Sequence, residues 1–68
     1  MKKVEINEIG NQMAKSGLPE GFVSDAVDMA FEFEGIQDLL IMWYEENDEK
    51  ERTETIKVIQ DLINDWKS

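Results

Sequence analysis

The fold of this chain depends on how one stretch is read, residues 19–46, PEGFVSDAVDMAFEFEGIQDLLIMWYEE. Apolar residues recur along this stretch at alternating intervals of four and three, which is the spacing of one helical face. These positions are Phe22, Ala26, Met29, Phe33, Ile36, Leu40 and Trp43. The stretch is therefore predicted to be helical, and the open question is whether it forms one helix or two.

Gly35 separates these two interpretations. If the helix continues through Gly35, residues 19–46 form a rod about 42 Å long, kinked at that glycine. If Gly35 lies just past a helix end, the stretch becomes two helices, 19–34 and 36–46. We favour two helices, because a chain of 68 residues must fold back on itself to cover its apolar faces.

A shorter helix is predicted before this stretch, over residues 5–16. Gly17 suits a left-handed helix end, and Pro19 cannot continue the helix beyond it. Gly10 weakens the same helix by about 1 kcal/mol relative to alanine. Its apolar stripe is Ile6, Ile9 and Met13.

The last helix is predicted over residues 49–66. Asp48 is a good N-cap, and Glu51 three residues later resembles the second half of a capping box. Six apolar residues cover an arc of about 160° on this helix. They are Ile56, Val58, Ile59, Leu62, Ile63 and Trp66. We expect Ile59 and Trp66 in particular to be buried.

The predicted fold is therefore all-α: a single domain, residues 1–68, built as a small bundle of three to four short helices. The helices lie at about 5–16, 19–34, 36–46 and 49–66, and the middle two are alternatively one helix kinked at Gly35.

The composition argues against catalysis and against metal binding. The chain has no cysteine and no histidine, so it lacks the commonest nucleophilic thiol, general base and metal ligands. It contains no nucleophile elbow and no phosphate-binding glycine loop. Residues 45–51 are rich in carboxylates but lack the alternating order and the glycine of a calcium loop. We therefore expect no enzyme, no metal and no cofactor.

The negative charge is concentrated in the middle of the chain. The whole chain carries 16 Asp and Glu against 7 Lys and Arg, a net charge of −9. Residues 16–49 contain ten acids and no Lys or Arg. Within this segment Asp25, Asp28 and Glu32 fall within about 60° on one helical face. This charge predicts no direct binding to nucleic acid or to anionic membranes, and a basic protein as partner.

An uninterrupted apolar run, Leu39 to Tyr44, lies in the same segment. Six consecutive residues point all around a helix, so one stripe cannot bury them all. Either this helix is central and surrounded by the other segments, or part of it faces solvent as a contact patch. In the second case we expect Ile41 and Tyr44 to point outward and to bind a partner. The run is also much shorter than the ~20 residues of a membrane span, and with the lack of cysteine it favours a cytoplasmic location.

Together these features predict a small acidic protein–protein interaction module, or regulator, that acts by binding. The predicted partner has an apolar groove and a basic rim, and the predicted contact residues are Ile41, Tyr44, Asp25, Asp28 and Glu32. Two alternatives stay open. One is an acidic inhibitor or decoy of a nucleic-acid-binding protein, and the other is an obligate homodimeric structural protein.

Overall fold

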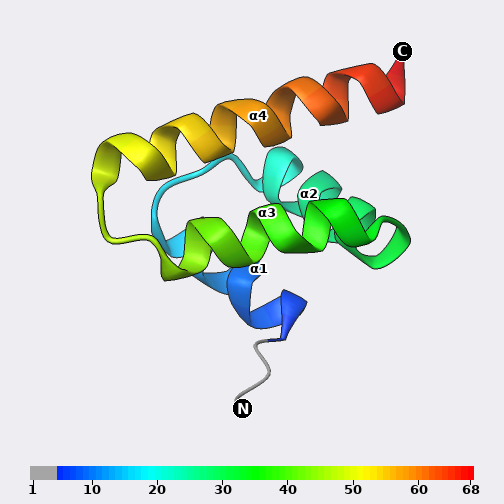
Figure 1. Ribbon diagram of the computed structural model, residues 1–68. Coiled ribbons are helices and arrows are strands. Elements are labelled where there is room, and N and C mark those ends of the chain that lie inside the picture. Colours follow the sequence, from blue (N-terminus) through cyan, green and yellow to red (C-terminus); the bar gives the residue numbers. More distant parts are fainter. Residues whose placement is uncertain (1–4) are drawn as a thin grey trace.

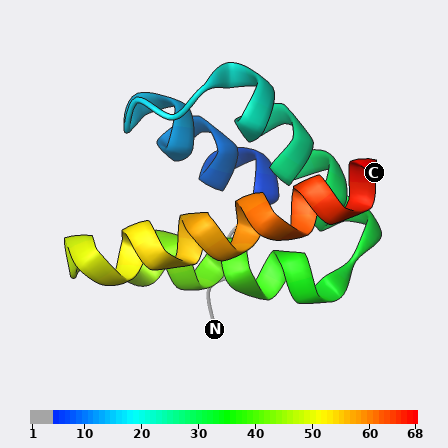
Figure 2. The same cartoon turned by 90° about the horizontal axis from the view of Figure 1, so that it is seen from above.

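The computed structural model describes residues 5–68, and these residues form four α-helices and no strand. The helices are α1 (Ile6–Lys15), α2 (Glu20–Glu32), α3 (Glu34–Glu45) and α4 (Glu49–Lys67). In Figure 1, α4 lies above α3 and the two run antiparallel. Figure 2 shows α1 and α2 side by side across this pair. The all-α bundle expected from the sequence is confirmed.

The buried core draws residues from all four helices. From α1 and α2 come Ile9, Met13, Ala26, Met29 and Ala30, and from α3 and α4 come Ile36, Leu40, Trp43, Ile59 and Ile63. Helix α2 packs against both α3 and α4, while α1 packs against α2 and α3. No polar or charged side chain is buried among the described residues, so area removed from water is the main stabilising term.

The break between α2 and α3 occurs at Phe33 and not at Gly35. Phe33 has extended backbone angles, φ −126° and ψ 120°. Its N–H donates to the Met29 carbonyl at 2.7 Å, and its own carbonyl accepts from Ile36 N–H at 3.1 Å. Phe33 thus ends one helix and starts the next, while Gly35 lies inside α3 without a positive φ. The preference for two helices is confirmed, but the position predicted for the break is wrong by two residues.

Local capping sets the other helix ends. Gly17 has φ 92° and donates its N–H to the Ala14 carbonyl, while Leu18 N–H reaches back to the Met13 carbonyl. These two bonds form the left-handed glycine cap expected from the sequence. At α4, the Asp48 side chain accepts from Lys50 N–H at 3.1 Å, which confirms the N-cap.

The second half of the expected capping box is supplied by another residue. In a capping box, Glu51 would accept from the Asp48 N–H. Instead the Glu46 carboxylate accepts from both Asn47 N–H and Asp48 N–H, at 2.9 and 3.1 Å. The connection between α3 and α4 is therefore held by a side chain that precedes it.

Gly10 is required by a close contact between α1 and α2. A Cβ atom at this position would lie 2.8 Å from Val27 Cγ2, and Val27 is a stiff β-branched residue. Gly10→Ala is expected to destabilise the fold by about 1 kcal/mol, since overpacking at about 1–3 kcal/mol exceeds the gain of about 1 kcal/mol in helix propensity. Urea denaturation followed by circular dichroism measures this change.

Gly35→Ala is the matched control for Gly10→Ala. Nothing lies within 4 Å of a Cβ at Gly35, which is also helical. This variant is expected to gain up to about 0.5–1 kcal/mol. Stabilisation by both substitutions would show that α1 and α2 do not approach as closely as the Gly10 contact requires.

Candidate interaction surface

The predicted outward residues of the apolar run are only partly outward. Ile41 and Tyr44 are both half-buried and pack against the core from one flank of α3. Met42, between them, is the most exposed residue of the run at 57%. The run is thus arranged with Leu40 and Trp43 in the core, Ile41 and Tyr44 on one flank, and Leu39 and Met42 on the other.

The acidic face of α2 is partly neutralised from the far end of the chain. Asp25 is half-buried, and its carboxylate bonds to the Lys67 ammonium at 2.9 Å. Asp28 and Glu32 are exposed. Because the Asp25–Lys67 pair lies largely at the surface, it contributes about 0–1 kcal/mol to stability. Its main consequence is that one of the three predicted contact carboxylates already has a partner within the chain.

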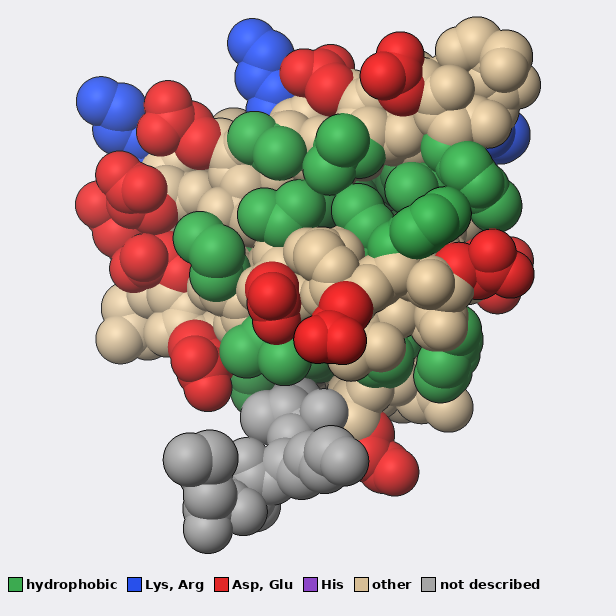
Figure 3. Space-filling view, turned by 45° about the vertical axis from the view of Figure 1, so that its right-hand side comes forward, with side chains coloured by type: hydrophobic (Ala, Val, Ile, Leu, Met, Phe, Trp, Pro, Cys, Tyr) green, Lys and Arg blue, Asp and Glu red, His purple; other side chains and the backbone are tan. Residues whose placement is uncertain are grey.

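An apolar groove lies between α3 and the C-terminal half of α4, and it is called here the α3/α4 groove. It has a volume of about 560 Å³ and is lined by Met29, Phe33, Gly35, Ile36, Leu39, Leu62, Asp65 and Trp66. Ile36 and Met29 form its buried floor, whereas Phe33, Leu62 and Trp66 are exposed. Figure 3 shows hydrophobic side chains gathered in a band along this seam.

Two further exposed side chains extend the groove along the same helices. Val58 precedes Leu62 by one turn of α4, and Met42 follows Leu39 by about one turn of α3. The exposed apolar surface therefore continues beyond the groove itself. An apolar area of this kind that persists on a folded chain is typical of interaction sites.

Trp66 is the clearest departure from the expected burial. It was predicted to be buried, but 45% of its surface is exposed. On a helical wheel Trp66 lies at the centre of the apolar arc of α4, which is about 160° wide. It stands in the last turn of the helix, beyond the buried Ile59 and Ile63, where the bundle leaves part of its side chain in water. The arc was visible in the sequence, but how far along α4 the bundle covers it was not.

Carboxylates flank the groove on both helices. On α4, Asp65 lines the groove, and Glu54 lies within about 20° of Asp65 on a helical wheel, close to Val58. On α3, the residues that follow Leu39 and Met42 around the helix are all acidic and exposed. They are Asp38, Glu45 and Glu34. Figure 3 shows carboxylates on both sides of the apolar band.

Among residues 5–68, the cations of this region lie on α4. Helix α3 has no Lys or Arg, whereas Lys50 and Lys57 lie on the outer side of α4, further from the groove than Asp65. The potential over the groove is therefore dominated by negative charge on both edges.

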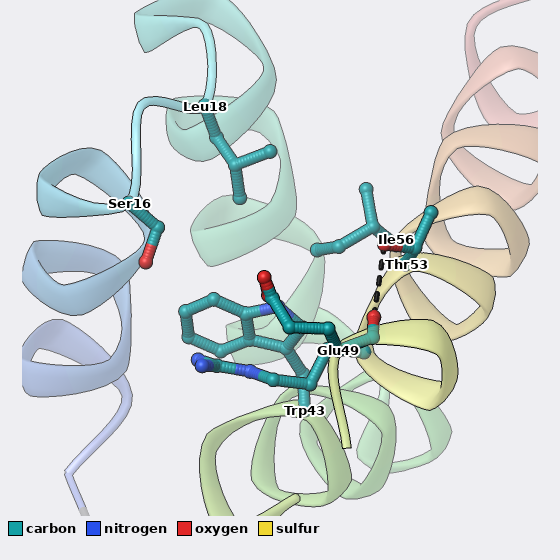
Figure 4. A pocket seen from close by; sticks show the side chains of 7 residues that line it. Ser16, Leu18, Trp43, Glu49, Thr53 and Ile56 are labelled. Atoms are coloured by element: carbon teal, nitrogen blue, oxygen red, sulfur yellow. Dashed lines mark hydrogen bonds between the residues drawn. The ribbon is translucent and has the colours of Figure 1, made fainter. Parts of the chain in front are cut away.

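A second, smaller hollow lies over the other end of α4. It measures about 190 Å³ and is lined by Ser16, Leu18, Trp43, Glu49, Arg52, Thr53 and Ile56. Figure 4 shows the Leu18, Glu49 and Ile56 side chains around the Trp43 indole. The Arg52 guanidinium carbon stacks 4.1 Å from the centroid of the Trp43 ring, a cation–π contact worth about 0.5–1 kcal/mol. The hollow is smaller than the ~300 Å³ of a typical ligand pocket. The side chains that line it cover Trp43.

Within residues 5–68, no three or more Asp and Glu side chains come together in an arrangement that holds a metal ion. None of the helices described is both long and apolar enough to cross a bilayer. The α3/α4 groove is the candidate site, because large apolar side chains that line it are exposed. Comparisons with protein-family models, with curated proteins and with solved structures found no match for this chain.

Proposed function

We propose that this protein is a small interaction module that acts by binding another protein through the α3/α4 groove. The observation that carries the proposal is the continuity of exposed large side chains along the seam. Leu62 and Trp66 on α4 face Phe33 and Leu39 across a floor that is already buried. Trp is enriched among residues that dominate binding energy, and covering this surface would remove apolar area from water at about 25 cal/mol per Å².

The proposal moves the apolar part of the contact from one flank of α3 to the other. Ile41 and Tyr44 were predicted as contacts, but neither lines the groove, and both are half-buried against the core, as is Leu39. Leu39 does line the groove, and Met42, about one turn further along the same flank, is 57% exposed. The acidic half of the prediction is kept as a proposal, with Asp28 and Glu32 as peripheral charges that speed association. We propose the cytoplasm as the location of this protein, because the chain has no cysteine and therefore no disulfide that would need an oxidising compartment to form.

The decoy and the homodimer are alternatives with different signatures. A decoy presenting the carboxylates of α2 would bind basic proteins with a steep salt dependence and would be insensitive to changes in the groove. An obligate homodimer would show a melting temperature that rises with protein concentration.

The test is to identify the partner and then measure its affinity for matched variants. The full-length protein is used to capture binders from its native host, and the captured protein is purified and titrated by calorimetry. Leu62→Ser is expected to weaken binding by at least about 10-fold, mainly through faster dissociation. Asp28→Asn combined with Glu32→Gln is expected to slow association and to flatten its salt dependence.

Folding of each variant is checked by its thermal transition, because Leu62 is 39% exposed and its loss should leave the fold intact. Tyr44→Ser serves as the comparison on the other flank of α3. A partner that binds Leu62→Ser as tightly as the natural chain, yet loses affinity for Tyr44→Ser, would contradict the assignment to the groove.

A further inference from the structure

We infer that the occupant of the α3/α4 groove is an amphipathic helix of a different protein, with Lys or Arg on both flanks of its apolar stripe. This inference rests on the proposed function and specifies the chemistry of the partner. It is drawn from the shape of the groove, from the hydrogen bonding of its walls and from the charges on its edges.

The length of the groove matches two turns of helix. Along α3, Phe33 and Met42 are nine residues apart, which is about 14 Å at 1.5 Å per residue. Along α4, Val58 and Trp66 are eight residues apart, or about 12 Å. Apolar residues at positions i, i+3 or i+4, and i+7 of a partner helix span about 10 Å, so three such anchors fit between these limits.

The walls of the groove favour a helix over an extended peptide. Beyond the first turn of α3, both walls are helices whose backbone groups are bonded within the helix, and residues 5–68 offer no sheet edge for strand addition. An extended peptide lying in the apolar groove would lose water from its own N–H and C=O groups without gaining partners for them. A helix satisfies these groups internally and brings only side chains to the groove.

The charges on both edges select a basic partner and disfavour a second copy of this chain. Asp38 on α3 and Asp65 on α4 are exposed beside the apolar surface, and Asp65 lines the groove itself. Lys and Arg side chains reach such carboxylates while their methylene stems cover apolar area. A symmetric contact through the same groove would instead bring these acids together, between two chains of net charge −9 each.

A displayed library of peptides about 20 residues long tests the inference. The library fixes Leu or Phe at positions i, i+4 and i+7 and draws all flanking positions equally from Lys, Arg, Glu, Gln and Ser. The full-length protein is the target. Selected peptides are expected to be enriched in Lys and Arg on both flanks, and to lose at least about 10-fold in affinity for Leu62→Ser. Raising the salt from about 50 to about 300 mM is expected to weaken binding further.

Tryptophan fluorescence locates the bound peptide on the protein. Trp66 is 45% exposed and Trp43 only 3%, so a peptide in the groove is expected to shift the emission to shorter wavelength through Trp66. In Trp66→Phe the shift should vanish, even at peptide concentrations that calorimetry shows to saturate this variant. Binding that leaves the Trp66 emission and the Leu62→Ser affinity unchanged would overturn the inference.

Other outcomes separate this inference from the proposed function. If the selected peptides have acidic or neutral flanks, or if no peptide is selected, the inference of a basic helical occupant is overturned. If a native partner still requires Leu62 in that case, the proposed function stands. Sedimentation equilibrium that shows a dimer dispersed by Leu62→Ser would identify a second copy as the occupant and also overturn the inference. A native partner that binds Leu62→Ser as tightly as the natural chain would contradict both the inference and the proposed function.

Discussion

Trp43→Ala is expected to lower the free energy of unfolding by about 3–5 kcal/mol, the largest single effect predicted for this chain. Trp43 is 3% exposed and lies in the core beneath the stacked guanidinium of Arg52. Its removal leaves a cavity and also strips Arg52 of its cation–π partner. Because 68 residues at about 0.05–0.15 kcal/mol each give a stability of only about 3–10 kcal/mol, much of the variant should be unfolded at room temperature.

Trp66→Ala is the matched control, since it removes the same side chain from an exposed site. Trp66 lies in the last turn of α4 and keeps nearly half of its surface in water. We expect a loss of about 1 kcal/mol or less. Urea denaturation of both variants, followed by circular dichroism, compares the two costs. Equal losses of unfolding free energy would show that Trp66 is as buried as Trp43. Trp66 could then not form an exposed wall of the groove.

Ile59→Ala is expected to cost about 2–5 kcal/mol. Ile59 is fully buried on the face of α4 that meets the core, and the void left behind has no polar lining to admit water. Substitution at this position should therefore shift the urea midpoint strongly without changing the slope of the transition.

Lys57→Ala is the control on the same helix. Lys57 is exposed on the opposite side of α4, so its replacement should change stability by less than about 0.5 kcal/mol. A Lys57 variant that loses as much as the Ile59 variant would mean that α4 is rotated relative to the core. In that case Leu62 and Trp66 would not line the α3/α4 groove as described.

The features predicted correctly from the sequence are those that neighbouring residues decide. Gly17 ends α1 because a left-handed residue is needed there, and Asp48 starts α4 because its side chain reaches a backbone N–H two residues on. The burial of Ile59 followed from the same kind of reasoning, since it lies near the centre of the apolar arc of α4 and about halfway along that helix.

The features predicted incorrectly depend on segments far apart along the chain. Phe33 is an ordinary helix residue by its own preferences, and an extended conformation there is selected because it returns Ile36, Leu40 and Trp43 to the core. Asp25 meets Lys67 across 42 positions, a distance at which no sequence pattern indicates a contact.

The candidate site shows the same division. The sequence by itself determined that the chain is helical, that its middle is acidic, and that α3 and α4 carry more apolar residues than one stripe can bury. Only the tertiary structure decided which of these residues stay in water. The four helices of residues 5–68 share one core, and α1 and α2 cover α3 and α4 from one side alone. Met42 on α3 and Val58, Leu62 and Trp66 on α4 are therefore left exposed, next to the half-buried Leu39, where a partner can reach them.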